Sequence, residues 1–426
     1  MKKIFKSLLL LTCVSSTSLL AYAPTNFYRP HDIDFRLHEW KHNDFRIGAI
    51  TEYGQTTKCR DWDENKRNVM QLYNLKESSV AMLLGAPNGS KIDKFAKSLG
   101  ISAATATDDD YRGRFILTGK YEEFNSVIFA KYKLPINLSG IFELGVFVPI
   151  KSMEFYHIKW DDQTKDVLTA DKEFKEEVSD QLETKAQELG GLNINKNGWS
   201  KSGIGDVIVA LGWQRDFAQQ QKEYLKNVRV NASAGISIPT GEKKDENQSF
   251  SLPLGNDGAW GIPMSLGLDL DFVYNFRAGF ELDFFGLFDT TRTYRMKTFR
   301  QQTDFLLLHK GEATKSQGAT WRFHLFGQAK RIVKGFSALI GYEFLKHDED
   351  RLSPKSYDFS YHIVNSAESL HEWNVHNFVF ELGYDPFGQN SKFAVKPHMS
   401  FFYKMPVTGK RVITTPTFGG QVAFSF

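Results

Sequence analysis

The chain has 426 residues, 24% of them charged, and a formal net charge of only +3. The basic residues are not gathered into one run, so charge gives no support for nucleic acid as a partner. No internal run of about twenty apolar residues is present, which excludes a helical membrane protein.

The first residues, 1–23, have a basic start and an apolar core, the pattern of a secretory signal peptide. Cleavage after Ala23 fits the small-residue rule, but Pro24 would then follow the cut, so cleavage after Ala21 stays open. After removal of this segment the chain keeps a single cysteine, Cys59, which excludes an intramolecular disulfide.

Segments with large apolar residues at alternate positions recur along the rest of the chain, which predicts β-strands. They cover Phe45–Tyr53, Phe124–Leu134, Phe142–Ile150, Val207–Trp213, Val228–Ile238, Trp260–Phe276, Phe280–Phe288, Trp321–Ala329, Phe336–Phe344, Phe378–Tyr384, Phe393–Met405 and Phe418–Phe426. We therefore expect a periplasmic N-terminal segment at 24–44 and a barrel of about twelve strands over 45–426. Fourteen strands are the alternative, with Tyr111–Tyr121 as the candidate for an extra strand.

The segment Trp260–Phe276 carries the clearest alternation, and it is longer than an ordinary soluble strand. A strand tilted across a bilayer needs about nine to eleven residues. The apolar face is aromatic at its ends and aliphatic in its middle, which favours a face in contact with lipid. We expect these side chains to face lipid: Trp260, Leu266, Leu268, Leu270, Tyr274, Phe401 and Phe426. A soluble secreted β-protein, with its apolar faces inward, would need a very wide core.

Long and short connections between these segments alternate. Long links follow the odd segments up to the ninth, and most even segments are followed by short turns. Outer-membrane barrels have long loops outside and short turns in the periplasm, and an even strand number puts both termini in the periplasm. The predicted fold is therefore an all-β transmembrane antiparallel barrel, with short helices in loop 1 and loop 2.

Loop 1, at 54–112, is a long loop or plug-like insertion, too apolar to be freely solvated. Its apolar residues fit short amphipathic helices. We expect it to fold into the barrel mouth or lumen as a constriction, formed by Val69, Met70, Leu72, Tyr73, Leu83 and Leu84. A compact helical cap on the outer surface is the alternative.

The polar positions between the apolar ones should line the lumen. The expected lining residues are Arg46, Asp269, Asp271, Glu281, Asp283, Arg322, His324, Lys396, His398 and Lys404. In a closed ring of twelve strands, the acidic residues of the sixth and seventh strands would face basic residues across the lumen. Lumen charges can set the selectivity of a channel. Alternatively, these charges pair with one another and fill a narrow barrel.

The final ten residues, Thr417–Phe426, place apolar residues at alternate positions before a terminal aromatic. This pattern resembles the closing strand of Gram-negative outer-membrane proteins. The stretches Gly235–Gly241 and Gly203–Asp206 resemble strand ends of passive outer-membrane transporters of the porin type. The resemblance implies a location in the cell outer membrane of a Gram-negative bacterium. It also implies that the barrel-assembly machinery recognises the closing strand.

The sequence thus predicts an outer-membrane channel or passive transporter for small solutes through a charged lumen, in contact with outer-membrane lipid. A closed barrel acting as a surface-exposed binding or structural protein is the alternative, and association into homo-oligomers stays open. His398 and Ser400 have the spacing of outer-membrane phospholipases but fall on the polar face, so we expect no enzyme. No motif for a metal or another cofactor is present.

Overall fold

The computed structural model describes most of the expected barrel. The described residues are 44–72, 86–98, 115–136, 138–162, 181–194, 197–220, 222–300, 302–333, 335–386 and 395–426. The expected signal peptide (1–23), nearly all of the segment 24–44, and Tyr73, Leu83 and Leu84 of loop 1 lie outside them.

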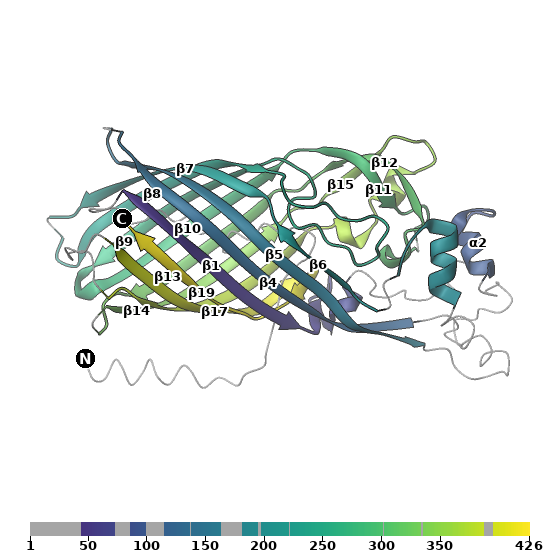
Figure 1. Cartoon of the computed structure of the whole chain (residues 1–426), viewed down its shortest axis with the longest axis horizontal. Helices are drawn as coiled ribbons and strands as arrows, with labels where there is room; N and C mark the ends of the chain where they lie inside the picture. Colours follow the sequence, from purple (N-terminus) through teal and green to yellow (C-terminus); the bar gives the residue numbers. More distant parts are fainter. Residues whose placement is uncertain are drawn as a thin grey trace.

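Twelve antiparallel strands form a closed barrel, as Figure 1 shows. The strands are β1 (Phe45–Thr56), β4 (Phe115–Leu134), β5 (Ile141–Asp162), β7 (Val207–Ala218), β8 (Leu225–Ile238), β9 (Gly261–Phe272), β10 (Phe276–Leu287), β13 (Thr320–Ala329), β14 (Phe336–His347), β16 (Trp373–Tyr384), β17 (Lys396–Lys410) and β19 (Thr417–Ser425). Each of the twelve expected segments overlaps one of these strands, so the predicted fold class is confirmed.

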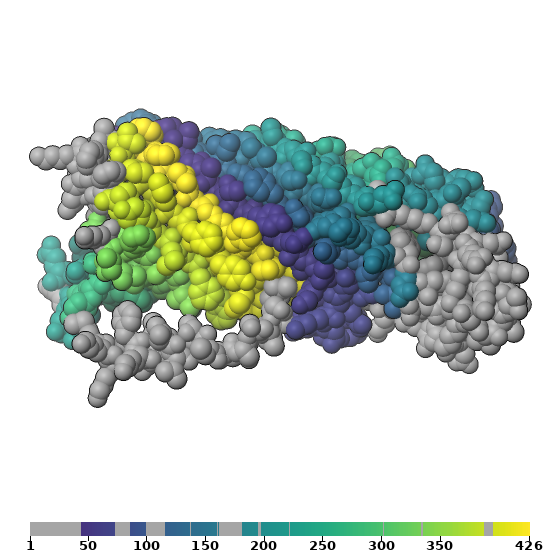
Figure 2. Space-filling model, turned by 60° about the horizontal axis from the view of Figure 1, so that its bottom comes forward, coloured from purple at the N-terminus to yellow at the C-terminus, as the bar shows by residue number. Residues whose placement is uncertain are grey.

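The first and last strands close the barrel. β1 pairs with β19 from Arg46 opposite Ser425 to Gly54 opposite Thr417, and it pairs with β4 on its other side. Figure 2 shows β1, in purple, running beside the yellow C-terminal strand. Closure leaves these strands without a free edge, which is what a strand needs inside hydrocarbon.

The apolar face of the wall points outward, as expected. Leu266 on β9 is 50% exposed, whereas Asp269 on the same strand is 3% exposed. Trp260, Phe401 and Phe426 are likewise exposed, and Leu268 and Leu270 are half-buried. Because side chains alternate across a strand, the polar residues between them face the interior.

The structure confirms the expected twelve strands and corrects one strand boundary. Of the candidate extra strand Tyr111–Tyr121, residues 115–121 begin β4 instead of forming a separate strand, and 111–114 lie outside the described residues. The sixth expected strand ends at Phe272, where a 3-10 turn, η4 (Val273–Asn275), leads into β10. Tyr274 is therefore 90% exposed at the tip of this turn rather than on the wall, and its φ is 61°.

The two ends of the barrel differ. Short links join β4 to β5, β7 to β8, β9 to β10, β13 to β14 and β16 to β17 at the end that holds the C-terminus, which we call the turn end. The other links lie at the opposite end, the loop end, on the right of Figure 1. The β4–β5 hairpin also continues past the rim here, with strands of 20 and 22 residues.

The loop-end links fold into a separate layer, which we call the cap: the described residues within 57–114, 163–206, 239–260, 288–319, 348–372 and 411–416. The cap contains β2 (Lys58–Arg60), β3 (Lys66–Asn68), η2 (Val69–Gln71), α2 (Lys91–Ser98), a helix at 181–190, β6 (Trp199–Ile204), β11 (Thr290–Met296), η5 (Asp304–Leu306), β12 (His309–Ser316), β15 (Arg351–Pro354), α4 (Tyr361–Val364), η6 (Glu368–Leu370) and β18 (Val412–Thr414). The expected helices in loops 1 and 2 are thus present. Across the described ranges no helix is long and apolar enough to cross a membrane.

One apolar core holds the cap together. Cys59 and Ile92 of loop 1 pack with Leu182 of loop 2 and Leu308 of the β10–β13 link. The core also contains Tyr121 and Phe155, which lie on the extension of the β4–β5 hairpin. Burial of this surface stabilises the cap on the rim of the barrel.

Candidate functional site: the polar barrel interior

Polar and charged side chains from around the wall point into the barrel. The buried ones on the strands include Arg46, Glu52, Asn125, Lys131, Glu143, Arg229, Asn231, Asp269, Arg277, Glu281, Asp283, Arg322, His324, Glu343, Asn377 and Lys404. Burying a charge is costly unless it is paired and hydrogen-bonded. The pairing of these groups therefore decides what the interior can do.

Arg322 on β13 holds the largest of these clusters. Its guanidinium lies 2.8 Å from the Glu281 carboxylate and 3.7 Å from that of Glu343, and it also donates to Asp283. Asp283 is the direct ladder partner of Arg322, so the strand register brings the two together. Asn377 donates to Glu343 at 2.8 Å. One cation therefore bridges three carboxylates from two neighbouring strands.

A second cluster lies closer to the turn end. Arg277 is 2.8 Å from Asp271 and 3.6 Å from Asp269, and Lys330 is 3.2 Å from Asp271. Arg277 is the direct ladder partner of Asp271. The acidic residues of β9 are therefore neutralised within their own part of the wall.

The opposite wall carries its own pairs. Lys404 lies 3.6 Å from Glu52, which also accepts a 3.2 Å hydrogen bond from the Asn125 amide. Lys131 lies 3.5 Å from Glu143. Both lysines are thereby balanced by local carboxylates.

The expected opposition of acidic and basic walls across the lumen is therefore wrong for the described pairs. Asp269, Asp271, Glu281 and Asp283 are matched by arginines of their own side. At a separation of 3–4 Å in a weakly polarisable interior, a direct pair is stronger than one across a barrel. The alternative from the sequence, local pairing of the lumen charges, describes this arrangement.

The remaining residues that we expected to line the lumen differ in how exposed they are. His324 is buried, with its ring 5.6 Å from that of Phe326, whereas Lys396 and His398 are half-buried on β17. Ser400 is 9% exposed, and Phe401 beside it is 56% exposed. His398 and Ser400 therefore lie on the interior face, as their parity predicts.

Inward-facing aromatic rings lie along the wall, over glycines of neighbouring strands. Phe129 on β4 is the ladder partner of Gly48, and a Cβ on that glycine would meet the ring at 2.7 Å. Phe402 on β17 is the ladder partner of Gly419, where the corresponding distance is 2.5 Å. A glycine opposite leaves room for the ring to lie flat. Each of these rings therefore packs over the glycine of the neighbouring strand.

These aromatic residues belong to an apolar cluster that the sequence did not single out. The cluster contains Ile50, Val127, Phe129, Phe147, Ile208, Ala210, Phe285, Phe402 and Ala423. Its members come from β1, β4, β5, β7, β10, β17 and β19 and share the inward parity. An aromatic residue at an inward position, with a glycine on the neighbouring strand, was the sequence pattern that could have predicted these rings. The interior is thus polar with an apolar section, not uniformly charged.

The described part of loop 1 belongs to the cap. Val69, Met70 and Leu72 are buried in the cap core, and Met70 packs against Gly119 on the extension of β4. The Asn68 side chain begins η2 by accepting from the Met70 amide at 3.1 Å. This arrangement matches the alternative of a compact cap, while the expected constriction residues Tyr73, Leu83 and Leu84 lie outside the described residues.

The two glycine-rich stretches of the sequence meet at the rim. The Thr240 hydroxyl donates to the Gly205 carbonyl at 2.8 Å and accepts from the Val207 amide at 3.0 Å. Asp206 is buried and accepts from the amides of Gly241 at 2.8 Å and Asn256 at 2.6 Å. These hydrogen bonds attach both ends of the β8–β9 link to the start of β7.

The fold is similar to that of a known outer-membrane protein. The crystal structure of an outer membrane channel from Pseudomonas putida F1 has a TM-score of 0.53 at 11% identity, covering 92% of this chain and 100% of that chain. The β domain of the Bordetella autotransporter Brka has a TM-score of 0.36 at 8% identity, covering 90% and 100%. The CymD monoaromatic hydrocarbon channel has a TM-score of 0.32 at 8% identity, covering 91% and 89%. These two scores are too low to support an argument.

No protein-family model and no curated protein matched the sequence. The likeness to the Pseudomonas putida channel therefore shows the fold of an outer-membrane β-barrel. A shared fold does not by itself determine the function.

Proposed function

We propose that this protein is a passive channel for small solutes in the outer membrane of a Gram-negative bacterium. One observation carries the proposal: a closed barrel with an apolar outer face encloses an interior lined by charged and hydrogen-bonding side chains.

The paired charges suggest how such a channel would select. The interior charges lie in local clusters, and the Arg322 cluster holds one cation against three carboxylates. We propose that small solutes pass through a lumen lined by such locally paired charges. Interior charges remain available to tune ion preference, as in other channels.

A closed barrel acting as a surface-exposed binding protein is the second candidate. The folded cap, with its own apolar core at the loop end, favours it. In this case the barrel would be an anchor, and the cap would carry the activity.

Liposome swelling separates the two candidates. Purified full-length protein is reconstituted, and swelling is followed with sugars, amino acids and apolar solutes of increasing size. A channel gives size-dependent swelling with at least one class, and planar bilayers show an ion current. Intact, folded barrels that give neither swelling nor current would rule out the channel and leave the binding protein.

We further propose that the barrel-assembly machinery recognises the closing strand, β19. Its exposed residues Phe418, Val422 and Phe424 form a continuous apolar face next to lipid. Replacing Phe426 with Ser should lower the amount of folded barrel in the outer membrane without affecting folding in detergent. Cross-linking of purified barrels in lipid would show whether copies associate.

A further inference from the structure

A cavity of about 170 Å³ lies inside the cap, apart from the barrel interior. Apolar side chains form much of its wall, including Val69, Met70, Phe250, Met296, Leu352 and Val364. They come from loop 1 and from the β8–β9, β10–β13 and β14–β16 links. A dry cavity of about 150 Å³ holds one benzene molecule, so this cavity has room for a molecule of similar or slightly larger size.

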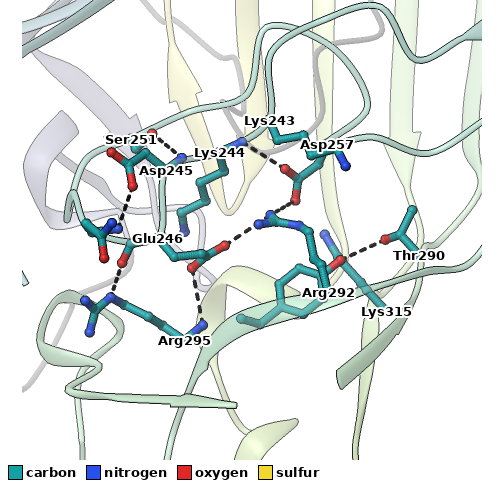
Figure 3. A network of polar contacts seen from close by, with 12 residues as sticks. Lys243, Lys244, Asp245, Glu246, Ser251, Asp257, Thr290, Arg292, Arg295 and Lys315 are labelled. Carbon is teal, nitrogen blue, oxygen red and sulfur yellow. Dashed lines mark hydrogen bonds and ion pairs between the residues drawn. The ribbon is translucent and has the colours of Figure 1, made fainter. Parts of the chain in front are cut away.

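Several charged residues at this cavity belong to the polar network of Figure 3. Arg292 donates to Asp257 and lies 3.1 Å from Glu246. Arg295 donates to the backbone carbonyls of Gly191 at 2.8 Å and Leu307 at 2.7 Å. Both carboxylates that line this side are therefore already paired with a cation.

The cations on the other side of the cavity are also engaged. Lys315 lies 2.7 Å from Asp350. Lys297 lies 4.0 Å from Asp304 and donates to the Ser366 carbonyl at 3.1 Å. These four cap residues thus form two internal pairs with little charge left for a ligand.

Lys244 differs from the other lining cations. Its backbone amide donates to Asp257 at 2.9 Å, but among the described residues its ammonium has no bonded partner. Figure 3 shows its side chain extending from the loop toward the side where Glu246 lies. The cavity is lined by four cations, Lys244, Arg295, Lys297 and Lys315, against three carboxylates, so its wall carries an excess of positive charge.

We propose that the cap cavity binds a small amphipathic carboxylate, with its apolar body against Met70 and Val364 and its carboxylate on Lys244. The volume suits a body of roughly six to ten non-hydrogen atoms, such as a short chain or a single ring. Apolar walls with a few placed polar groups are the usual composition of such sites. The site belongs to the cap, so the inference stands whether or not the barrel conducts.

Isothermal titration of the full-length protein in detergent tests this inference with three probes of one shape: hexanoate, hexanol and hexylamine. Hexanoate should bind saturably at one site, hexanol about tenfold more weakly because it lacks the charge-assisted contact, and hexylamine not at all. Equal binding of hexanoate and hexylamine, or no saturable binding of hexanoate, would overturn the proposal.

Two variants locate the site. Lys244→Gln should weaken hexanoate binding about tenfold and leave hexanol unchanged. Lys243→Gln is the matched control, since the neighbouring lysine is exposed and does not line the cavity, and it should bind like the wild type. Val364→Phe fills the cavity and should abolish binding of both probes. Circular dichroism confirms folding, and a folded Val364→Phe protein that still binds hexanoate would contradict the assignment.

Discussion

Arg322 illustrates how single residues determine the interior of this barrel. It is 3% exposed and is held among Glu281, Asp283 and Glu343. A buried charge without its partner is far more costly than the paired state is favourable. Stability and lumen chemistry therefore depend on the same side chain.

Replacing Arg322 with Gln should destabilise the barrel by about 3–5 kcal/mol, because three carboxylates would lose their common cation. Urea unfolding in lipid vesicles measures the change. Arg351→Gln is the control, since its pair with Glu349 is exposed and should contribute little. Equal midpoints for the two variants would show that the cluster does not stabilise the interior.

Sequence reasoning found the inward residues but not their partners. Asp283 and Arg322 both follow from alternation, yet their pairing requires the register of β10 against β13. Register depends on where each strand ends, and the alternation of apolar residues continues through Tyr274 although the backbone there turns. The alternation along a strand therefore predicts which face a residue lies on more reliably than it predicts the cross-strand partner of that residue.

At the scale of elements, the barrel wall contains cross-strand pairs in which an inward aromatic ring packs over a glycine. Gly419 on β19 lies under the ring of Phe402 on β17. Gly420 is the next residue but has the opposite parity, and a Cβ added there would meet the Ser400 carbonyl oxygen at 3.0 Å. The two glycines thus offer a matched comparison.

Gly419→Ala should displace the Phe402 ring and also strain the ladder with β1, because an added Cβ would meet the Thr51 carbonyl oxygen as well as the ring, so the stability cost should be at least about 1–3 kcal/mol. We expect a lower single-channel conductance at an equal amount of folded protein. Gly420→Ala should leave the conductance at the wild-type value. A Gly419→Ala channel as conductive as the Gly420→Ala channel would refute the role of these rings.

The small sheet of β11, β12 and β15 predicts an acid response of the cap. Burial opposes the charge of Asp350, but Lys315 at 2.7 Å and His347 outweigh it, so the pKa of Asp350 is lowered. The lowered pKa stabilises the folded state at pH values above the pKa of an aspartate in the unfolded chain, about 3.9. This stabilisation is lost as the pH falls below that value.

Hydrogen exchange in β12 and β15, corrected for intrinsic rates, should accelerate as the pH drops below about 4. Asp350→Asn should exchange faster than the wild type at pH 5 and show a flatter pH dependence, because the titrating carboxylate is gone. If the wild type and Asp350→Asn showed the same acid dependence, the acid response would not come from Asp350.

The cap was the least predictable element. Period-two patterns predict strands locally, whereas the cap core joins Cys59, Ile92, Leu182 and Leu308 from three different links. No short window of sequence holds such a pattern. The apolar content of loop 1 did predict burial, but the partner surface is supplied by the hairpin extension with Tyr121 and Phe155.

At the scale of the whole molecule, barrel and cap share one hairpin. Toward the turn end, β4 and β5 form part of the barrel wall. Toward the loop end, their extensions supply Tyr121 and Phe155 to the cap core. Under the proposed function, solutes entering at the loop end pass the cap first.

The central claim is that the apolar side of each strand meets hydrocarbon and the polar side encloses the interior. Spin labels at two positions of β9 test it most directly, after Cys59→Ser. A label at 266 in lipid vesicles should be highly accessible to oxygen, which partitions into hydrocarbon, whereas a label at 269 should be shielded from it. A label at 269 that is exposed to oxygen, with the label at 266 shielded, would contradict the account.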